Sequence, residues 1–583
     1  MKVGESVPSS VTETLSQQLA HTAACTPEET AFTFVDHSTD SRGTVTSLTW
    51  KQLNTRVRVT ASGLRHMGAA GERVAIVAPQ SLEYIVGFLG AICAGAIAVP
   101  LFTPFLPGHK DKLAAVLQDA APVLMLSVED HRRPLTDFCA AQGIVSGCGV
   151  VTESDVQEAA QQPPVEDRDP QPGDVAYLQY TSGSTRIPSG VEITHSNVCI
   201  NARQALDAYD IRRGRNCTVG WLPLYHDMGL VLAVALPIMG HIPSVLMDPL
   251  AFIQQPGRWL SLLSEHKGAI TAAPNFAYDY CVERVTAEER AALTLGSVAA
   301  MVNGSEPIAP RTLDRFQAAF SAVGMKRMTM RPSYGLAEAT VFVSASPVGE
   351  EPTVTAFDRQ SLREGVARVV EDSDQEAVVE LVACGRPTGQ EIAIVDPSTH
   401  RRREDGQVGE IWLRGPNIGR GYWGCAESSE AAFRAVLEES EPWLRTGDLG
   451  VWHDKQLYVT GRLKDLVIVD GTNHYPHDIE ETVQKAHPVI RPHHIAAFAV
   501  ATAGGERLVV VAEHGRDLTD ADSVLEEVTR AVRAAVASEH GLALHDFLLV
   551  QPGAVPHTTS GKVARSACRD LYLAGTWAAP TGD

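Results

Sequence analysis

The stretch SLEYIVGFLGAICAGAIAVPLF, residues 81–102, decides the fold class. Its last eighteen residues, from position 85 onward, carry no charge, and this is the length of a membrane span. Gly95 divides the stretch into a helix that ends at a glycine and a short buried strand that Pro100 stops. A helix followed by a buried strand is half of a parallel α/β unit, so we predict that this segment does not cross a membrane.

The same alternation of strand-like and helical runs extends through the first half of the chain. The first series consists of RVAIVAP (73–79), the quoted stretch, KDKLAAVLQDA (110–120) and PVLMLS (122–127). The second consists of NCTVGWLPL (216–224), PSVLM (243–247), PGRWLSLLSEH (256–266), GAITAAP (268–274) and MTMRPSYG (328–335). Such alternation is typical of parallel sheets with helices on their faces. We predict an α/β fold with two subdomains, at about 1–172 and 173–346.

The pattern changes in the second half. Short strands with turns follow one another in QEIAIVDP (390–397), GEIWLRGP (409–416), LRTGDLG (444–450) and KQLYVTG (455–461), which predicts a small β-barrel or antiparallel sheet at about 379–461. The acidic segment 347–378 fits neither pattern and is interpreted as an insertion. Residues 462–583 have the size of a small α+β domain. The predicted organisation is a large N-terminal domain, 1–461, and a small C-terminal domain, 462–583.

Composition limits the possible partners and the compartment. Lys and Arg number 49 and Asp and Glu 70, a net charge of −21, which argues against non-specific nucleic-acid binding. The ten cysteines include no Cys-x-x-Cys pair, so neither a zinc site nor a disulfide framework is predicted. The N-terminal residues lack the apolar core of a secretory signal. A cytoplasmic protein is therefore expected.

Seven motifs appear in an order that resembles the adenylate-forming superfamily, which includes acyl-CoA synthetases, luciferases and the adenylation domains of peptide synthetases. They are TSGSTRIPSG (181–190), WLPLYHDMGL (221–230), NGSEPI (303–308), SYGLAEAT (333–340), LRTGDLG (444–450), GRLKDLVIVDGTNHYPHDIE (461–480) and TTSGK (558–562). The resemblance covers nearly the whole chain. It implies ATP and Mg²⁺ as cofactors and a C-terminal domain that is mobile.

The first motif is a candidate phosphate-binding loop. Closely spaced hydroxyls and backbone N–H groups suit the β- and γ-phosphates of ATP, although a Ser/Gly cluster on its own is more often a flexible turn. Arginine is a good bidentate partner of phosphate, so it can supply the charge of the lysine that this loop lacks. The candidate residues are Thr181, Ser182, Gly183, Ser184, Thr185 and Arg186.

The resemblance also assigns the rest of the nucleotide site. Tyr334 would stack on adenine, Asp448 would accept both ribose hydroxyls, and Arg462 would reach ribose and phosphate from the other side. A core tyrosine and a simple turn aspartate are the alternative interpretations of the first two. The edge of the base would be contacted by small residues of two loops, Gly304, Ser305, Ser333 and Gly335.

Catalytic roles follow from the same resemblance. Lys562 would be the mobile cation that meets the charge developing at the α-phosphorus. Glu338 would hold Mg²⁺ through oxygen. His226 would lie near the substrate carboxylate, with a purely structural histidine as the alternative. Lys464 matches the hinge about which the C-terminal domain turns between an adenylating and a thiol-accepting pose.

Three features resemble one branch of the superfamily, the fatty acyl-AMP ligases. They are Arg186 with Ser189 in the first loop, Ala337 before the candidate Mg²⁺ ligand, and the insertion. The branch activates a fatty acid as its adenylate and passes it to the phosphopantetheine thiol of an acyl carrier protein or of a carrier domain in a polyketide or peptide synthase. Its insertion is thought to restrain the C-terminal domain.

Two other functions stay open. A fatty acyl-CoA synthetase is one alternative, and a nucleotide-binding module with degraded catalysis, suggested by the missing loop lysine, is the other. His557 and Thr472 also depart from the usual pattern of the branch, near the presumed thiol-transfer face.

Overall fold

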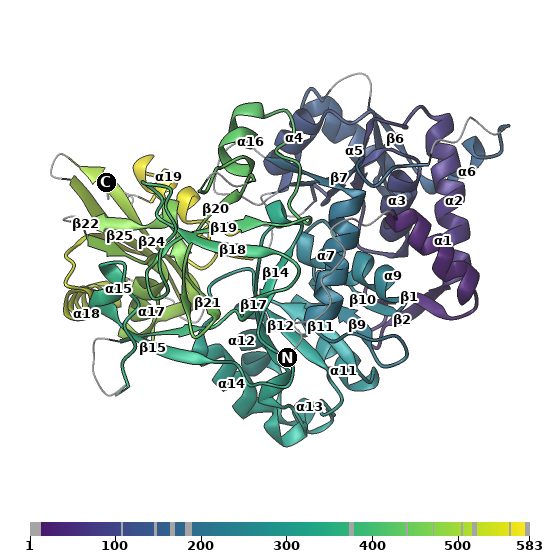
Figure 1. Ribbon diagram of the computed structural model, residues 1–583. Coiled ribbons are helices and arrows are strands. Elements are labelled where there is room, and N and C mark those ends of the chain that lie inside the picture. Colours follow the sequence, from purple (N-terminus) through teal and green to yellow (C-terminus); the bar gives the residue numbers. More distant parts are fainter. Residues whose placement is uncertain are drawn as a thin grey trace.

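The structure is a computed structural model that describes residues 13–105, 109–144, 148–163, 169–180, 189–371, 378–438, 441–469, 472–502, 505–515, 522–558 and 561–577. Two large sheets and their helices form one side of the molecule, and the C-terminal elements lie on the other (Figure 1).

The first large sheet has six strands in the order β6-β5-β3-β4-β7-β8, and all neighbours are parallel except β7 and β8. Its strands are β3 (Arg73–Val77), β4 (Ile97–Leu101), β5 (Leu124–Leu126), β6 (Gly149–Val151), β7 (Val175–Tyr180) and β8 (Gly190–Thr194). The helix α2 (Trp50–His66) precedes these strands, and the helices between them are α3 (Leu82–Cys93), α4 (His109–Ala120), α5 (Glu129–Ala141) and α6 (Glu153–Ala159).

The opening stretch forms α3 and β4, as predicted. Ser81 caps α3 by accepting a hydrogen bond from the N–H of Tyr84, and Gly95 leaves the helix with φ +75°. The strand does not stop at Pro100, which lies inside β4 and pairs with Ile76 of β3.

The second large sheet has nine strands in the order β17-β14-β13-β12-β11-β9-β10-β1-β2, with a parallel centre from β13 to β1 and antiparallel edges. They are β1 (Thr30–Asp36), β2 (Thr44–Thr49), β9 (Cys217–Gly220), β10 (Ser244–Met247), β11 (Ala269–Ala273), β12 (Ala300–Asn303), β13 (Met330–Gly335), β14 (Phe342–Ala345) and β17 (Arg386–Pro387). The accompanying helices are α1 (Leu15–Cys25), α7 (His195–Ala208), α8 (Asp227–Leu230), the π-helix η1 (Val231–Ala235), α9 (Leu236–Gly240), α10 (Pro249–Gln254), α11 (Gly257–Glu265), α12 (Asn275–Arg284), α13 (Ala287–Ala291) and α14 (Pro310–Phe320), with the 3₁₀ turns η2 (Ser321–Val323), η3 (Arg327–Thr329) and η4 (Ala337–Ala339).

The main hydrophobic core joins the two large sheets. It combines residues of the six-stranded sheet, such as Tyr177, with residues of the nine-stranded sheet, such as Phe32, and with helix α7. A second core covers the other face of the nine-stranded sheet with α11, α12 and α14 around Trp259 and Phe316. Burial on both faces explains why these parallel strands are nearly continuous apolar runs in the sequence.

The predicted division at 172 and 173 is not a division between sheets. Strands β1 and β2 belong to the second sheet, and β7 and β8 belong to the first. The chain thus passes from the nine-stranded sheet to the six-stranded sheet after β2, and returns to the nine-stranded sheet between β8 and β9.

Four antiparallel strands follow in the part where a small barrel or sheet is predicted. Their order is β18-β19-β20-β21, with β18 (Glu391–Val395), β19 (Gly409–Arg414), β20 (Leu444–His453) and β21 (Gln456–Arg462), and α16 (Ala426–Phe433) lies between β19 and β20. The segment interpreted as an insertion forms β15 (Val354–Asp358) and α15 (Arg359–Arg363), and β15 pairs with β16 (Val378–Val382).

The C-terminal part is a small α+β unit, as predicted. It begins with the 3₁₀ turn η5 (Leu463–Asp465) and the pair β22 (Val467–Val469) and β23 (Thr472–His474). Helices α17 (Pro476–Ala486), α18 (Asp522–His540) and α19 (Arg565–Leu573) accompany the sheet β24 (Ile490–Thr502), β25 (Gly505–His514) and β26 (Leu544–Val550). Its own core includes Ile479, Val510 and Val532.

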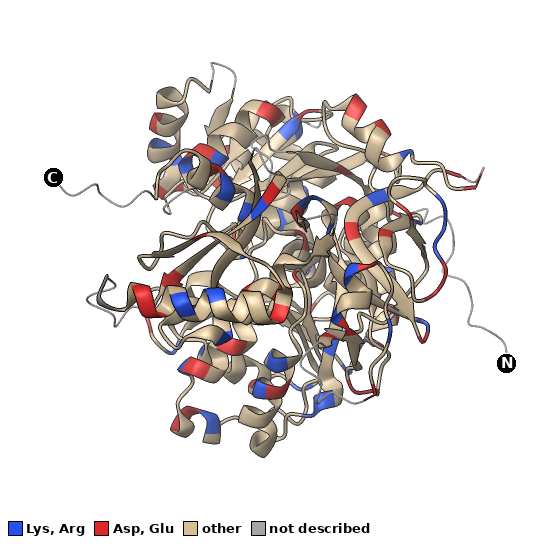
Figure 2. Ribbon diagram, turned by 90° about the vertical axis from the view of Figure 1, so that its left-hand side faces the viewer, with Lys and Arg blue, Asp and Glu red and all other residues tan. Residues whose placement is uncertain are grey.

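The α/β fold class is confirmed. None of the helices in the described part of the chain is both long and apolar enough to cross a membrane. On the face that the C-terminal unit presents, basic and acidic residues are interspersed along the helices (Figure 2).

Candidate functional site

The candidate site lies where several strands of the nine-stranded sheet end. The loop after β9 carries His226, the loop after β12 carries Gly304 and Ser305, and β13 itself ends with Ser333, Tyr334 and Gly335. Because β9, β12 and β13 run parallel, their carboxyl ends meet at one edge of the sheet, which is the usual place for ligands in such folds.

Tyr334 joins this edge to the antiparallel strands β20 and β21. The buried Tyr334 hydroxyl donates a hydrogen bond to Asp448 Oδ2 over 2.8 Å. Arg462 Nε donates to Asp448 Oδ1, also over 2.8 Å. Burial, together with the charge of Asp448, holds the pKa of Tyr334 well above its ordinary value. Three of the predicted nucleotide-binding residues therefore form one hydrogen-bonded group.

Glu338 lies in η4, just beyond Tyr334. Its Oε1 accepts a hydrogen bond of 2.8 Å from the hydroxyl of Tyr422. Burial raises the pKa of Glu338, while the Tyr422 hydrogen bond and the charge of Arg462 act in the opposite direction. A carboxylate is the hard oxygen ligand that Mg²⁺ prefers, and Mg²⁺ is usually held by one or two carboxylates together with substrate phosphates. The residues present therefore fit the predicted ion.

The loop that carries Lys562 is folded onto the N-terminal part. The backbone N–H of Thr558 donates to the carbonyl of Lys562 over 2.7 Å. Gly561 has φ +84°, and a Cβ there would lie 3.2 Å from the ring of Phe276 on α12. Lys112 Nζ on α4 donates to the carbonyl of His557 over 3.4 Å. Contacts on two sides thus hold the loop in place.

Lys562 lies among charged residues of the candidate site. Burial lowers its pKa, and the positive charge of Arg462 lowers it further, while Glu306, Asp227 and Asp448 act in the opposite direction. Burial alone would raise the pKa of Asp227, but the charges of His226 and Lys562 hold it below its ordinary value. The C-terminal unit therefore places a cation beside the carboxylates of the N-terminal part.

His226 is held by its neighbour in the chain. Its Nδ1 lies 2.6 Å from Asp227 Oδ1, which also accepts a hydrogen bond of 2.7 Å from the N–H of Met228. Gly229, two residues after Asp227, packs against the loop that precedes His226. A Cβ at Gly229 would lie 2.0 Å from the carbonyl oxygen of Pro223. The motif WLPLYHDMGL therefore needs a glycine at this position to place His226.

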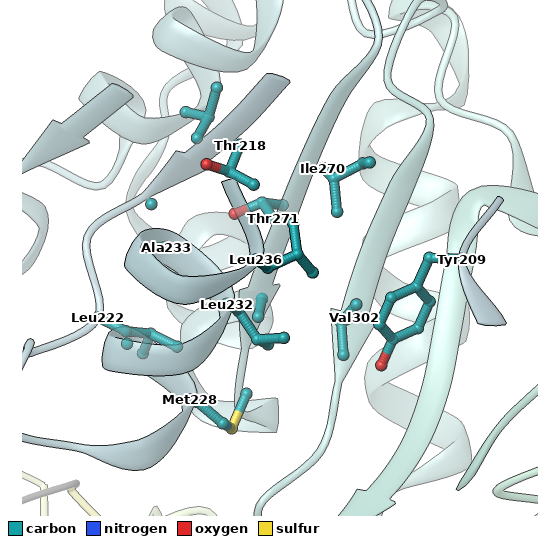
Figure 3. Close-up of a pocket in the computed structure, with 14 residues that line it drawn as sticks. Tyr209, Thr218, Leu222, Met228, Leu232, Ala233, Leu236, Ile270, Thr271 and Val302 are labelled. Carbon is teal, nitrogen blue, oxygen red and sulfur yellow. The ribbon is translucent and has the colours of Figure 1, made fainter. Parts of the chain in front are cut away.

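Two adjoining cavities lie at this edge of the sheet. One is lined mostly by apolar residues of β9, η1 and β11 (Figure 3). The other is lined by Asp227, Gly304, Ser305, Ser333 and Tyr334 among others. They share Tyr209, Met228, Leu232 and Val302. An apolar chamber thus opens from the chamber that the nucleotide-binding motifs line.

The structure does not place every predicted residue. Positions 181–186, the candidate phosphate-binding residues Thr181 to Arg186, lie outside the described residues. Lys464 lies in η5, directly after β21, and burial together with the charge of Arg462 lowers its pKa. The structure brings together the others, Lys562, Glu338, His226, Gly304, Ser305, Ser333, Tyr334, Gly335, Asp448 and Arg462.

Sequence reasoning missed three residues of this site. Asp227 and Glu306 stand inside two of the seven motifs, WLPLYHDMGL and NGSEPI. An acidic residue within a motif was therefore the signal that could have identified them as site residues. Tyr422 stands in GRGYWG, outside every motif, and the sequence offers no signal for its contact with Glu338.

We expect the Gly229→Ala substitution to displace the loop at 222–224 and with it His226, because a backbone atom occupies the place of the new Cβ. The ATP–pyrophosphate exchange that the resemblance implies should fall by about a hundredfold, the effect of roughly 1 Å of misplacement. Gly149→Ala is the control, since its Cβ would make only an ordinary 3.8 Å contact with Leu124. Equal exchange rates in the two variants would contradict this role of Gly229.

Comparisons with known proteins agree with the geometry. Residues 19–423 match the family of AMP-binding enzymes, and residues 464–580 match the AMP domain of the Disco-interacting protein 2-like type. The chain is 41% identical to the long-chain-fatty-acid–AMP ligase FadD26 of Mycobacterium marinum, over 97% of each protein. It is 40% identical to the 4-hydroxyphenylalkanoate adenylyltransferase of Mycobacterium tuberculosis, over 96% of this chain and 91% of that protein.

A solved structure from a study of fatty acyl-adenylate ligases of E. coli and L. pneumophila superposes with a TM-score of 0.85 and 31% identity, covering 97% of this chain and 98% of that one. The resemblance inferred from the seven motifs is thereby confirmed. The chain belongs to the AMP-binding enzyme family and, within it, to the fatty acyl-AMP ligase branch.

Proposed function

We propose that this protein joins a fatty acid to AMP at the expense of ATP, releasing pyrophosphate, and then passes the acyl group to the phosphopantetheine thiol of an acyl carrier protein or carrier domain. The observation that carries the proposal is the apolar chamber that opens beside Tyr334 and Asp448, with Lys562 brought to the same place by the C-terminal unit. An apolar chamber suits an acyl chain, and the polar one suits the nucleotide.

The chain's own residues would hold the nucleotide as follows. Tyr334 would stack on adenine, and Asp448, fixed by Tyr334 and Arg462, would accept the ribose hydroxyls with its remaining lone pairs. The hydroxyls and N–H groups of residues 181–186 would bind the outer phosphates. Glu338 would hold Mg²⁺, which when bound withdraws negative charge from the phosphates.

In the first reaction a carboxylate oxygen of the fatty acid attacks the α-phosphorus. The new oxygen–phosphorus bond forms as the bond to pyrophosphate breaks, and the electron pair leaves with pyrophosphate. Lys562 would hydrogen-bond to the oxygens on which charge grows, and its surrounding carboxylates favour the protonated ammonium that this role needs. His226, held by Asp227, would orient the attacking carboxylate.

The second reaction requires the C-terminal unit to move, and Lys464 in η5 is the proposed hinge. Contacts of the insertion oppose that movement. Arg359 on α15 lies 3.3 Å from Asp478 on α17 and donates to the carbonyl of Glu539 on α18 over 3.1 Å. Arg363 donates to the carbonyl of His540 over 3.1 Å. We infer that these two arginines restrain the unit and so disfavour the pose that accepts free CoA.

The central experiment is ATP–pyrophosphate exchange across fatty acids of graded length and 4-hydroxyphenylalkanoates, with CoA and a holo carrier protein as competing acceptors. We expect exchange that depends on the acid, transfer to the carrier and little acyl-CoA. The Lys562→Ala variant should lose exchange by about a hundredfold or more, because the oxygens on which charge grows would lose this hydrogen-bond donor. Acyl-CoA formation as fast as adenylation would favour an acyl-CoA synthetase, and absence of exchange with every acid would favour a degraded module.

The Tyr422→Phe substitution tests the role of Glu338. Its hydrogen bond opposes the upward shift of the Glu338 pKa, so removing it should raise that pKa further. Since the carboxylate form is needed, exchange is lost as pH falls through this pKa, and the acid limb of the pH–rate profile should move to higher pH in the variant. Tyr458→Phe, which removes a 2.8 Å contact with Thr355, is the matched control. An acid limb that stays in place would refute the assignment.

The restraint is tested by replacing Arg359 and Arg363 together with alanine. Loss of these contacts should raise the rate of acyl transfer to CoA by about tenfold, because one or two hydrogen bonds to charged groups contribute about that factor to an equilibrium. The rate of adenylation should not change. Arg368→Ala is the control, since Arg368 is an exposed residue of the same insertion. Point substitutions are preferable to deleting 347–378, which would remove β15, the partner of β16. A CoA rate equal to that of the control would refute the restraint.

A further inference from the structure

The strand β24 contains a distortion next to the N-terminal part of the molecule. The register of β24 against β25 shifts between Ile490 and Ile495. Within this bulge His493 has φ +61°, a left-handed conformation that is unfavourable for a histidine. Its backbone N–H is held by Gln484 Oε1 over 3.0 Å. Non-glycine residues held in this conformation are concentrated at functional sites.

The bulge directs the His493 side chain across the interface between the two parts of the molecule. His493 Nε2 lies 3.2 Å from Asp279 Oδ2 on α12. The Asp279 side chain is almost fully buried and is fixed by Thr312 and Arg315, each over 2.6 Å. The acceptor is thus rigid before His493 arrives, which suits a docking point better than a flexible surface carboxylate.

The same helix also receives the loop of the catalytic lysine. Phe276, which packs under Gly561, and Asp279 are three residues apart on α12 and therefore lie on one face of it. Glu306 lies near the N-terminus of this helix: burial raises its pKa, the backbone N–H groups of Asn275 and Phe276 act in the opposite direction, and its carboxylate is one of the charges acting on Lys562. One face of α12 thus contacts the C-terminal unit at two residues, Phe276 and Asp279.

From this arrangement we propose that His493 is a positioning residue for adenylation: its ion pair with Asp279 docks the C-terminal unit on α12 so that Lys562 reaches the reacting atoms. The inference rests on the proposed function in one respect, that the unit must leave this pose for acyl transfer. His493 itself touches no reacting group, so it acts through Lys562.

Charge makes the docking depend on pH. The groups facing His493 are Asp279 and Glu283 on α12, Glu306 after β12, and Arg315 on α14; Arg491 and His494 are its neighbours on β24. Burial would lower the pKa of His493, but Asp279, Glu306 and Glu283 together raise it above its ordinary value. The docked pose is therefore favoured while the imidazole is protonated, and this advantage is lost as pH rises through the raised pKa.

The test replaces His493 with asparagine, which tolerates the left-handed conformation but is too short to reach Asp279. His487→Asn is the matched control, because His487 pairs with Glu527 within the C-terminal unit. At about pH 6 the adenylation kcat of the His493 variant should be lower by about tenfold, the effect of one hydrogen bond or ion pair to a charged group. KM for ATP and for the acid should stay within about twofold, since substrates bind the N-terminal part. The ratio of wild-type to variant kcat should approach one as pH rises to about 9.

A second measurement does not depend on activity. Amide hydrogen exchange should show weaker protection of α12 and of residues 561–564 in the His493→Asn variant than in the wild type and the His487 control. Unchanged protection, or a kcat ratio that does not vary with pH, would overturn the proposal. If the wild-type protein showed no ATP–pyrophosphate exchange with any acid, the proposed function alone would be contradicted. The protection of amide hydrogens would still report on the docking of the C-terminal unit.

Discussion

The electrostatic environment of Lys562 is the constraint on which the rest of the structure depends. An ammonium group taken out of water needs compensation, and here it comes from Glu306, Asp227 and Asp448, which belong to a loop, a helix and a strand respectively. None of these carboxylates is in the same structural unit as the lysine. The C-terminal unit therefore has a favourable place where the three meet, and that place is fixed jointly by the loops after β9 and β12 of the nine-stranded sheet and by β20 of the four-stranded sheet.

The sequence predicted much of the fold because burial leaves a strong periodic signal. The helix and strand of residues 81–102, the runs around β9, β10 and β11, and the short strands β18 to β21 were all readable from their apolar patterns. Which sheet each strand joins was not readable. Strand β1 pairs with β10, about two hundred residues away, and pairing over such a distance leaves no local mark in the sequence.

In the candidate site too, residues with a local sequence signal could be predicted, and residues that act through contacts distant in sequence could not. Motif residues such as Tyr334, Asp448 and Lys562 each stand next to a glycine in a motif of unusual composition, so they could be singled out, and they are found together. Tyr422 and His493 act through contacts with residues distant in sequence, Glu338 and Asp279, and their own surroundings in the sequence are ordinary. The backbone conformation of His493 in particular becomes visible only in three dimensions.

The place of β1 and β2 at the far edge of the nine-stranded sheet has a consequence for synthesis of the chain. Strand β1 meets its parallel partner, β10, only after all the strands of the six-stranded sheet and β9 have been made. Until then the apolar strand β1, with Ala31 and Phe32, is an open edge of the kind that promotes misassociation. The antiparallel partner β2 protects one side of it early, since a hairpin can form from adjacent residues alone. Within the N-terminal hairpin, β2 thus covers one edge of β1 during folding, before the hairpin joins the nine-stranded sheet.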